Sequence, residues 1–225
     1  MRLIMKNNNA IKGEKCRRKF LRFFPQGFQD SKYEHWERTY KVNAHEMWKK
    51  LLNRQIYNSL LHEKEFSEIA KRAISIEAKT NFLFSFEKMA IRDAVATPEG
   101  ARLFAEGLAN FLWSKKKIND KYLEWAQTIA KLPRKQTRVL TWPILTVFGF
   151  IAAPKKFIFF KPMVTLIAAS KYGFEFNYHT PFSIETLESL LEFVRVLKKD
   201  IADLHPRDLI DIQSFIWVQG SSEYD

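Results

Sequence analysis

The stretch TPEGARLFAEGLANFLWSKKK, residues 97–117, indicates the fold class of this chain. Thr97 is suited to cap a helix, and Pro98 suits the first helical position, where its missing N–H would have no partner anyway. Apolar residues then recur in steps of three and four, the spacing of one helical face: Ala101, Phe104, Ala105, Leu108, Phe111 and Leu112. Lysines 115–117 follow, where positive charge is favourable against the helix dipole. The stretch predicts an amphipathic helix packed on a core.

The same periodicity recurs over most of the chain. It predicts further helices over residues 31–51, 56–61, 66–74, 84–95, 120–131, 164–172, 183–200 and from Pro206 onward. Ser31 with Glu34 reads as a capping box for one of these helices, and Ser183 as the cap of another. Gly173 is expected to end the helix over 164–172. The apolar run 144–153 is also assigned to a helix, because of its length and its alanines.

Two short segments in the C-terminal half are predicted to be strands. Phe157–Phe160 is a short aromatic run bounded by Lys156 and Pro162, and Phe174–Tyr178 alternates with a period of two. The predicted fold class is therefore mainly α, a compact multi-helix globule with a small two-stranded β element in its C-terminal half.

Breaks in the pattern suggest three parts. Residues 1–30 are expected to form an irregular, basic N-terminal arm, because Asn7–Asn9 and Gly13 disfavour a helix. Residues 31–132 form a predicted N-terminal helical subdomain. Residues 133–225 form a predicted C-terminal helical subdomain that carries the short β element.

Cysteine content and hydropathy favour the cytoplasm. A single cysteine, Cys16, cannot form an internal disulfide, and the N-terminal apolar run Leu3–Met5 is far shorter than a signal peptide needs. The uncharged run 139–154 is shorter than the about 20 residues of a bilayer span. It also contains Pro143. We therefore expect a buried core segment there and no membrane insertion.

The charge balance favours a polyanionic partner. The chain has 37 Lys and Arg against 25 Asp and Glu, a net charge of +12, and such an excess attracts nucleic acid. Cations gather in three clusters, the first two close to Phe or Pro and the third beside Phe157: Lys15, Arg17, Arg18, Lys19 and Arg22; Lys131, Arg134, Lys135 and Arg138; Lys155 and Lys156. Because cations neutralise phosphates and aromatic rings stack on bases, the sequence predicts a protein that binds the phosphate backbone of DNA or RNA.

No recognisable catalytic, cofactor or metal motif accompanies these clusters. HExxH, GxxxxGK[ST], GxGxxG and GxSxG are all absent from the sequence. Cys16 stands beside three cations that would lower its pKa, but no partner base is evident. The sequence thus predicts neither a cofactor nor a catalytic residue.

One polar cluster near the C-terminus leaves alternatives open. Asp208 and Asp211 are three residues apart, so both carboxylates would lie on one helix face and would suit a cation such as Mg²⁺. The same acids would also simply complement the helix dipole. Gln213 and Trp217 would either bind a base or close a core. The alternatives to nucleic-acid binding are a protein-interaction or scaffold role and a metal-assisted enzyme centred on Asp208 and Asp211.

Several motifs resemble those of a widespread family of uncharacterised bacterial proteins. They are Thr141-Trp142-Pro143, Phe157–Pro162 and the run DLIDIQSFIW at 208–217, with residues 24–28 and 86–90 in the same pattern. This resemblance spans most of the chain and implies no activity. The order of helices is also similar, by analogy only, to the helix-hairpin-helix DNA glycosylases, whose glycine-rich hairpin and lysine-plus-aspartate site are not found in this sequence.

Overall fold

The structure, a computed structural model, describes residues 2–225, with side chains from residue 11 onward, and consists of two units. Unit 1 contains the chain up to Thr39 and returns with Phe160–Asp225, and unit 2 is Tyr40–Phe159. These bounds differ from the predicted parts 1–30, 31–132 and 133–225. The two ends of the chain belong to one unit because α1 packs against the C-terminal helices, a long-range contact that local periodicity does not reveal.

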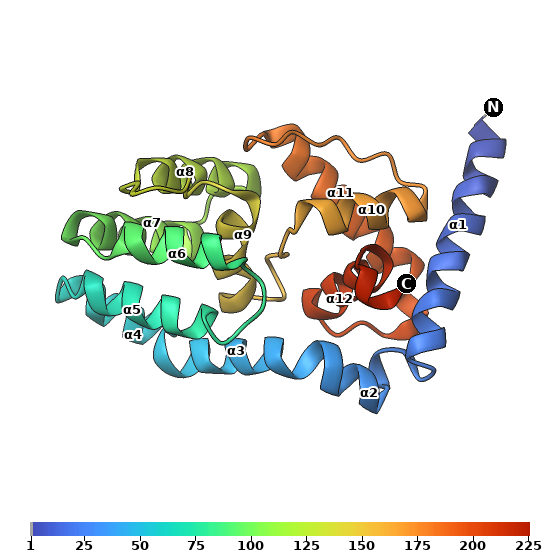
Figure 1. The fold of residues 1–225 in the computed structure, drawn as a ribbon, viewed down its shortest axis with the longest axis horizontal. Helices are drawn as coiled ribbons and strands as arrows, with labels where there is room; N and C mark the ends of the chain where they lie inside the picture. The colour runs from blue at the N-terminus through green and yellow to red at the C-terminus, as the bar shows by residue number, and fades with distance from the viewer. Residues whose placement is uncertain (1) are drawn as a thin grey trace. The chain divides into compact units, whose positions relative to one another are not determined.

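Unit 1 is built from helices at both ends of the chain. Its elements are α1 (Arg2–Phe23), α2 (Ser31–Tyr33), a π-helical turn (Glu34–Arg38), α10 (Pro162–Tyr172), α11 (Ile184–Asp200) and α12 (Leu209–Gly220). Short 3-10 turns at Gly27–Gln29, Ala202–Leu204 and Ser222–Tyr224 complete it. The first and last helices, blue and red in Figure 1, lie beside each other, and both contact α10.

The prediction of an irregular arm over residues 1–30 was wrong, because residues 2–23 form α1. An asparagine or glycine costs a helix only about 1 kcal/mol or less, and burial of the C-terminal half of α1 offsets that cost. Phe20 is fully buried, with ring centroids 4.8 Å from Phe28 and 5.3 Å from Phe215 of α12. Tertiary packing thus outweighs the local signals.

The tightest helix contact in unit 1 joins α10 to α12. Gly220 lies so close to α10 that a Cβ atom built on it would stand 1.9 Å from the carbonyl oxygen of Val164. Position 220 therefore has no room for a side chain. This contact fixes the distance between the two helices.

Replacing Gly220 with alanine should lower the free energy of unfolding by about 1–3 kcal/mol, because backbone atoms of α10 must move to admit the methyl group. Urea denaturation of the full chain measures the change. Ser170→Ala, at an exposed position on α10, is the control and should stay within about 0.5 kcal/mol of wild type. Equal midpoints for both variants would contradict the close approach.

In unit 2 the other helices surround one strongly apolar helix, α9 (Trp142–Ala152). Its elements are α3 (Thr39–Leu51, in this unit from Tyr40), α4 (Arg54–His62), α5 (Phe66–Glu77), α6 (Ser85–Val95), α7 (Pro98–Trp113), α8 (Ile118–Lys131) and α9 (Trp142–Ala152). Every residue from Trp142 to Ile151 is buried, among α5, α7 and α8. The indole N–H of Trp125 donates to the Leu145 carbonyl over 3.0 Å. The helix predicted over 144–153 is confirmed.

Most predicted helices and several caps are confirmed. The side chains of Thr97 and Ser183 accept the backbone N–H groups of Gly100 and Thr186, and Gly173 ends α10 in the left-handed region with φ of 82°. The cap expected at Ser31 is instead Asp30, whose carboxylate accepts the N–H of Lys32. The last helix begins after Asp208 rather than at Pro206.

The predicted two-stranded β element was wrong, because the described residues contain no strand. The two predicted strands, 157–160 and 174–178, meet through side chains: the ring of Phe160 stacks on that of Phe176, with centroids 5.7 Å apart. They do not form a β-ladder. The N–H of Asn177 donates to the Ser189 hydroxyl on α11, and the N–H of His179 to that of Thr186. The alternating pattern therefore reflects a half-buried loop on α11 and not a β-strand.

Unit 2 also buries a cationic side chain. Lys121 of α8 is 2% exposed, and its ammonium donates to the carbonyl oxygen of Phe111 over 3.1 Å. Burial, and then the nearby charge of Lys156, lowers the pKa of Lys121 from 10.5 to about 8. The unfolded chain therefore binds one more proton than the folded chain between those two values.

The free energy of unfolding of the wild type relative to Lys121→Met should consequently rise from pH 8 to pH 10, by on the order of 1 kcal/mol. Below pH 8 the difference should be constant. Denaturant midpoints across this pH range measure it. Lys115→Met, at an exposed position before α8, should show no such trend, and a flat difference for Lys121→Met would contradict the lowered pKa.

No helix within residues 2–225 combines the length and apolar character needed to cross a bilayer.

Candidate functional site

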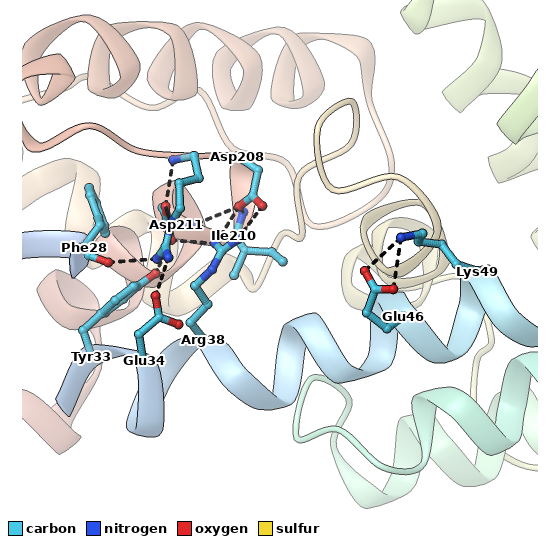
Figure 2. A network of polar contacts seen from close by, with 10 residues as sticks. Phe28, Tyr33, Glu34, Arg38, Glu46, Lys49, Asp208, Ile210 and Asp211 are labelled. Atoms are coloured by element: carbon cyan, nitrogen blue, oxygen red, sulfur yellow. Dashed lines mark hydrogen bonds and ion pairs between the residues drawn. The ribbon is translucent and has the colours of Figure 1, made fainter. Parts of the chain in front are cut away.

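The polar cluster predicted at the start of α12 is a buried ion-pair network in unit 1 (Figure 2). Asp208 caps α12 through the N–H groups of Ile210 and Asp211. The guanidinium of Arg38 bridges both carboxylates, at 2.8 Å from Asp208 and 2.7 Å from Asp211. The wide π-helical turn at 34–38 brings Arg38 and its neighbour Glu37 to the buried side together.

Asp211 is fully buried and uses both of its oxygens. Oδ1 accepts the Tyr33 hydroxyl over 2.6 Å as well as Arg38, and Oδ2 accepts the backbone N–H and side-chain Nε of Arg207 at 2.8 and 3.0 Å. Arg207 also pairs with Glu34 and donates to the Phe28 carbonyl. Figure 2 shows these side chains converging on Asp211 from segments at opposite ends of the sequence.

The pKa directions indicate an ionised Asp208 and a neutral Tyr33. Burial alone would raise the pKa of Asp208, but hydrogen bonds and charge from Arg38 hold that pKa below its ordinary value. Burial, and then the Asp211 carboxylate, raises the pKa of Tyr33 well above its usual range. Tyr33 therefore stays protonated and donates. Asp208 contributes stability above about pH 4, and this contribution is lost as the pH falls through its lowered pKa.

This arrangement removes the support for a metal-assisted site on Asp208 and Asp211. Two guanidinium groups occupy the positions where a cation would bind, and their charge repels one. Among residues 11–225 no group of three or more His, Cys, Asp or Glu side chains is placed to hold a metal ion. The pair holds unit 1 together instead.

Asp211→Ala should therefore lower the free energy of unfolding by about 3–5 kcal/mol, because Arg38 would keep its burial and lose a counter-charge. Asp203→Ala is the matched control, since Asp203 pairs with Arg17 at the surface of the same unit. Exposed pairs contribute only about 0–1 kcal/mol. Chemical denaturation compares the two, and similar losses would show that the buried network is not the stabilising one.

Gln213 and Trp217 do not form the base-binding pair that was one alternative. Gln213 is buried, with its Oε1 lacking a hydrogen-bond partner. The indole N–H of Trp217 donates to Glu223 over 3.1 Å, and Lys161 lies 5.1 Å from its ring centroid. Gln213 therefore lies in the interior of unit 1, and Trp217 lies at its edge.

Cys16 is also buried. Burial raises the pKa of its thiol to about 11 and makes it a poor nucleophile.

The N-terminal cations all lie on α1, and most have counter-charges. Arg17 pairs with Asp203, Arg18 with Glu14 at 3.7 Å, and Lys19 with Asp225 at 3.5 Å. Lys15 and Arg22 are exposed, and Arg22 lies over the ring of Phe23. The cluster is basic in sequence but largely compensated in space.

The second cluster is exposed and uncompensated. Lys131 ends α8, and Arg134, Lys135 and Arg138 lie in the segment that leads to α9; we call residues 131–138 the basic loop. None of these four side chains has an ion-pair partner among the described residues, and Arg134 donates only to the Gln136 carbonyl. Lys155 and Lys156 are likewise exposed, in the turn after α9.

An exposed aromatic surface lies beside the basic loop. Phe84 and Phe86, at the start of α6, are 51% and 48% exposed and stack on each other, with centroids 5.6 Å apart and planes 13° apart. Met89 follows one turn later, 39% exposed. We call these three residues the α6 ledge.

The ledge lies against the basic loop and is tied to the segment that follows the loop. A shallow crevice is lined by Met89, Ala90 and Asp93 of α6 and by Lys135, Gln136 and Thr137 of the basic loop. The buried carboxylate of Glu87 accepts the backbone N–H of Phe84 over 3.1 Å and the Thr141 hydroxyl over 2.8 Å. Glu87 thus holds the start of α6 against the segment that follows the loop.

Sequence reasoning found the loop but missed the ledge. The helix over 84–95 was predicted, but no surface role was assigned to its phenylalanines. A helical wheel carries the missing signal. Ala90, Ile91 and Ala94 form the buried stripe, and Phe86 and Met89 fall outside it.

Comparisons with known protein families, curated proteins and solved structures find no significant match. The resemblance to an uncharacterised bacterial family and the analogy with DNA glycosylases therefore stay predictions.

Proposed function

We propose that this protein binds single-stranded nucleic acid through the basic loop and the α6 ledge of unit 2. The observation that carries the proposal is the stacked, half-exposed pair of Phe84 and Phe86 beside cations that lack counter-charges. An exposed stacked pair offers a flat face to a base, and every base has a π-face. The loop cations contact the phosphates on either side.

A single strand suits this surface better than a duplex. The bases of a duplex are stacked on each other, so only its phosphates would meet the loop, and the aromatic pair would stay in water. Stacking contributes about 1–3 kcal/mol per base. The cations of α1 and of Lys155 and Lys156 add long-range attraction, but the ion pairs of α1 reduce its share.

Fluorescence anisotropy with labelled oligo-dT and oligo-rU of about 15 nucleotides tests this proposal. The wild-type affinity should fall with salt, with a slope of about 0.7 per phosphate contact. Arg134→Glu/Lys135→Glu should weaken binding and flatten that slope. Phe84→Ser/Phe86→Ser should weaken binding by at least about tenfold and leave the slope unchanged, because no charge is altered.

Lys198→Glu/Lys199→Glu is the charge-matched control, because both lysines are exposed at the end of α11 in unit 1. Equal losses for the two charge reversals would mean that affinity follows net charge and not the loop. No binding of either oligonucleotide by the wild type at low salt would reject the proposal. Equal oligonucleotide affinity of the wild type and Phe84→Ser/Phe86→Ser would show that the ledge does not contact nucleic acid and would favour a protein partner for it.

A further inference from the structure

A groove on α3 of unit 2 is unconnected with the residues discussed so far. It has a volume of about 510 Å³, and it is lined by Tyr40, Asn43, Ala44, Glu46, Met47 and Lys50 of α3 and by Lys79, which follows α5. Six of these seven residues come from one helix face, at steps of one to three. The volume lies within the range of small-molecule sites, about 300–1,000 Å³.

The base of the groove is apolar and includes a flat ring. Tyr40 packs against Phe82 with centroids 6.0 Å apart, and the buried Lys41 ammonium lies 5.3 Å from the centroid of the Tyr40 ring, so these two contacts hold the ring in place. Phe82 in turn packs on Phe150 of α9. Ala44 is buried and Met47 half-buried. A fixed ring with a polarizable methionine nearby suits a planar aromatic ligand.

The rim of the groove is positively charged. Its one acid, Glu46, receives Lys49 at 3.0 Å on both carboxylate oxygens, as Figure 2 shows. Lys50 and Lys79 are exposed, and neither has an acidic partner among the described residues. The two unpaired ammonium groups favour an anion, while the exposed Asn43 amide offers a donor and an acceptor.

We propose that this groove binds a nucleotide, with the base on Tyr40 and Met47, the phosphate between Lys50 and Lys79, and Asn43 at the edge of the base. A nucleotide is the ligand that contacts all three features, namely the apolar base of the groove with its ring, the two lysines and the Asn43 amide. Inorganic phosphate would contact only the lysines, and a nucleoside would contact only the ring and the amide. The inference shares no residue with the basic loop or the α6 ledge and does not depend on the proposed function.

Two kinds of ligand present such a nucleotide to the groove: a free mononucleotide and the phosphorylated end of a nucleic-acid strand. Calorimetric titration of the full chain with AMP, and separately with adenosine and with inorganic phosphate, tests the site. AMP should bind with a dissociation constant in the micromolar to millimolar range, and adenosine and phosphate each at least about tenfold more weakly. The side-chain amide signal of Asn43 in a ¹H–¹⁵N spectrum should shift with AMP.

Lys50→Glu/Lys79→Glu should weaken AMP binding at least about tenfold. Lys71→Glu/Lys115→Glu reverses two other exposed lysines of unit 2 and should leave AMP binding unchanged. Competition by an oligo-dT carrying a 5′-phosphate, but not by the same strand without it, would assign the site to strand ends. Failure of both strands to compete would assign it to the free nucleotide.

Three results would overturn the inference. They are no AMP binding at millimolar concentration, equal affinity for AMP and for phosphate or adenosine alone, and loss of AMP binding in Arg134→Glu/Lys135→Glu as large as in the groove variant. The last result would place the ligand at the basic loop. Loss of oligonucleotide binding with AMP binding retained would reject the proposed function and leave the groove site intact.

Discussion

The structure of unit 1 depends on one buried carboxylate. Asp211 is removed from water, which is costly for a charge unless cations and hydrogen-bond donors surround it. Arg38, Arg207 and Tyr33 supply these, and they come from both ends of the chain. Without Asp211, the segment that follows α1 would lose most of the polar contacts that hold it against α12. This contact, together with the packing of Phe20 and the close approach of Gly220 to α10, turns a local helix pattern into a specific tertiary arrangement.

Secondary structure in this chain could be predicted wherever local energetics agree with packing. The helices α7, α10 and α11 have caps or helix ends that the sequence indicates, α9 has the length and alanines that favour a helix, and all four form as expected. The predictions for residues 2–23 and 174–178 are wrong for opposite reasons. Burial of Phe20 overrides poor helix formers in α1, whereas hydroxyls of α11 take N–H groups that a strand would have paired.

For the candidate sites too, features that depend on neighbouring residues could be predicted, and features that depend on residues far apart in the sequence could not. That Asp208 and Asp211 share a helix face follows from their spacing, but their partner Arg38 lies about 170 residues earlier and no local pattern names it. The basic loop could be predicted because its charges are adjacent in sequence. The α3 groove could not, because Lys79 reaches it from the turn after α5, far from α3 in the sequence.

Net charge is therefore a weaker guide than the distribution of counter-charges. The chain carries +12 overall, yet three of the five cations in the N-terminal cluster Lys15–Arg22 face an acid within 4 Å, and none of the four in the basic loop does. A paired cation must give up its partner before it can bind a phosphate, whereas an unpaired one gives up only water and small ions. Under the proposed function, the loop cations would therefore bind phosphates more readily than the paired cations of α1. The same reasoning applies to Lys50 and Lys79, because Lys49 already neutralises the only acid of their groove.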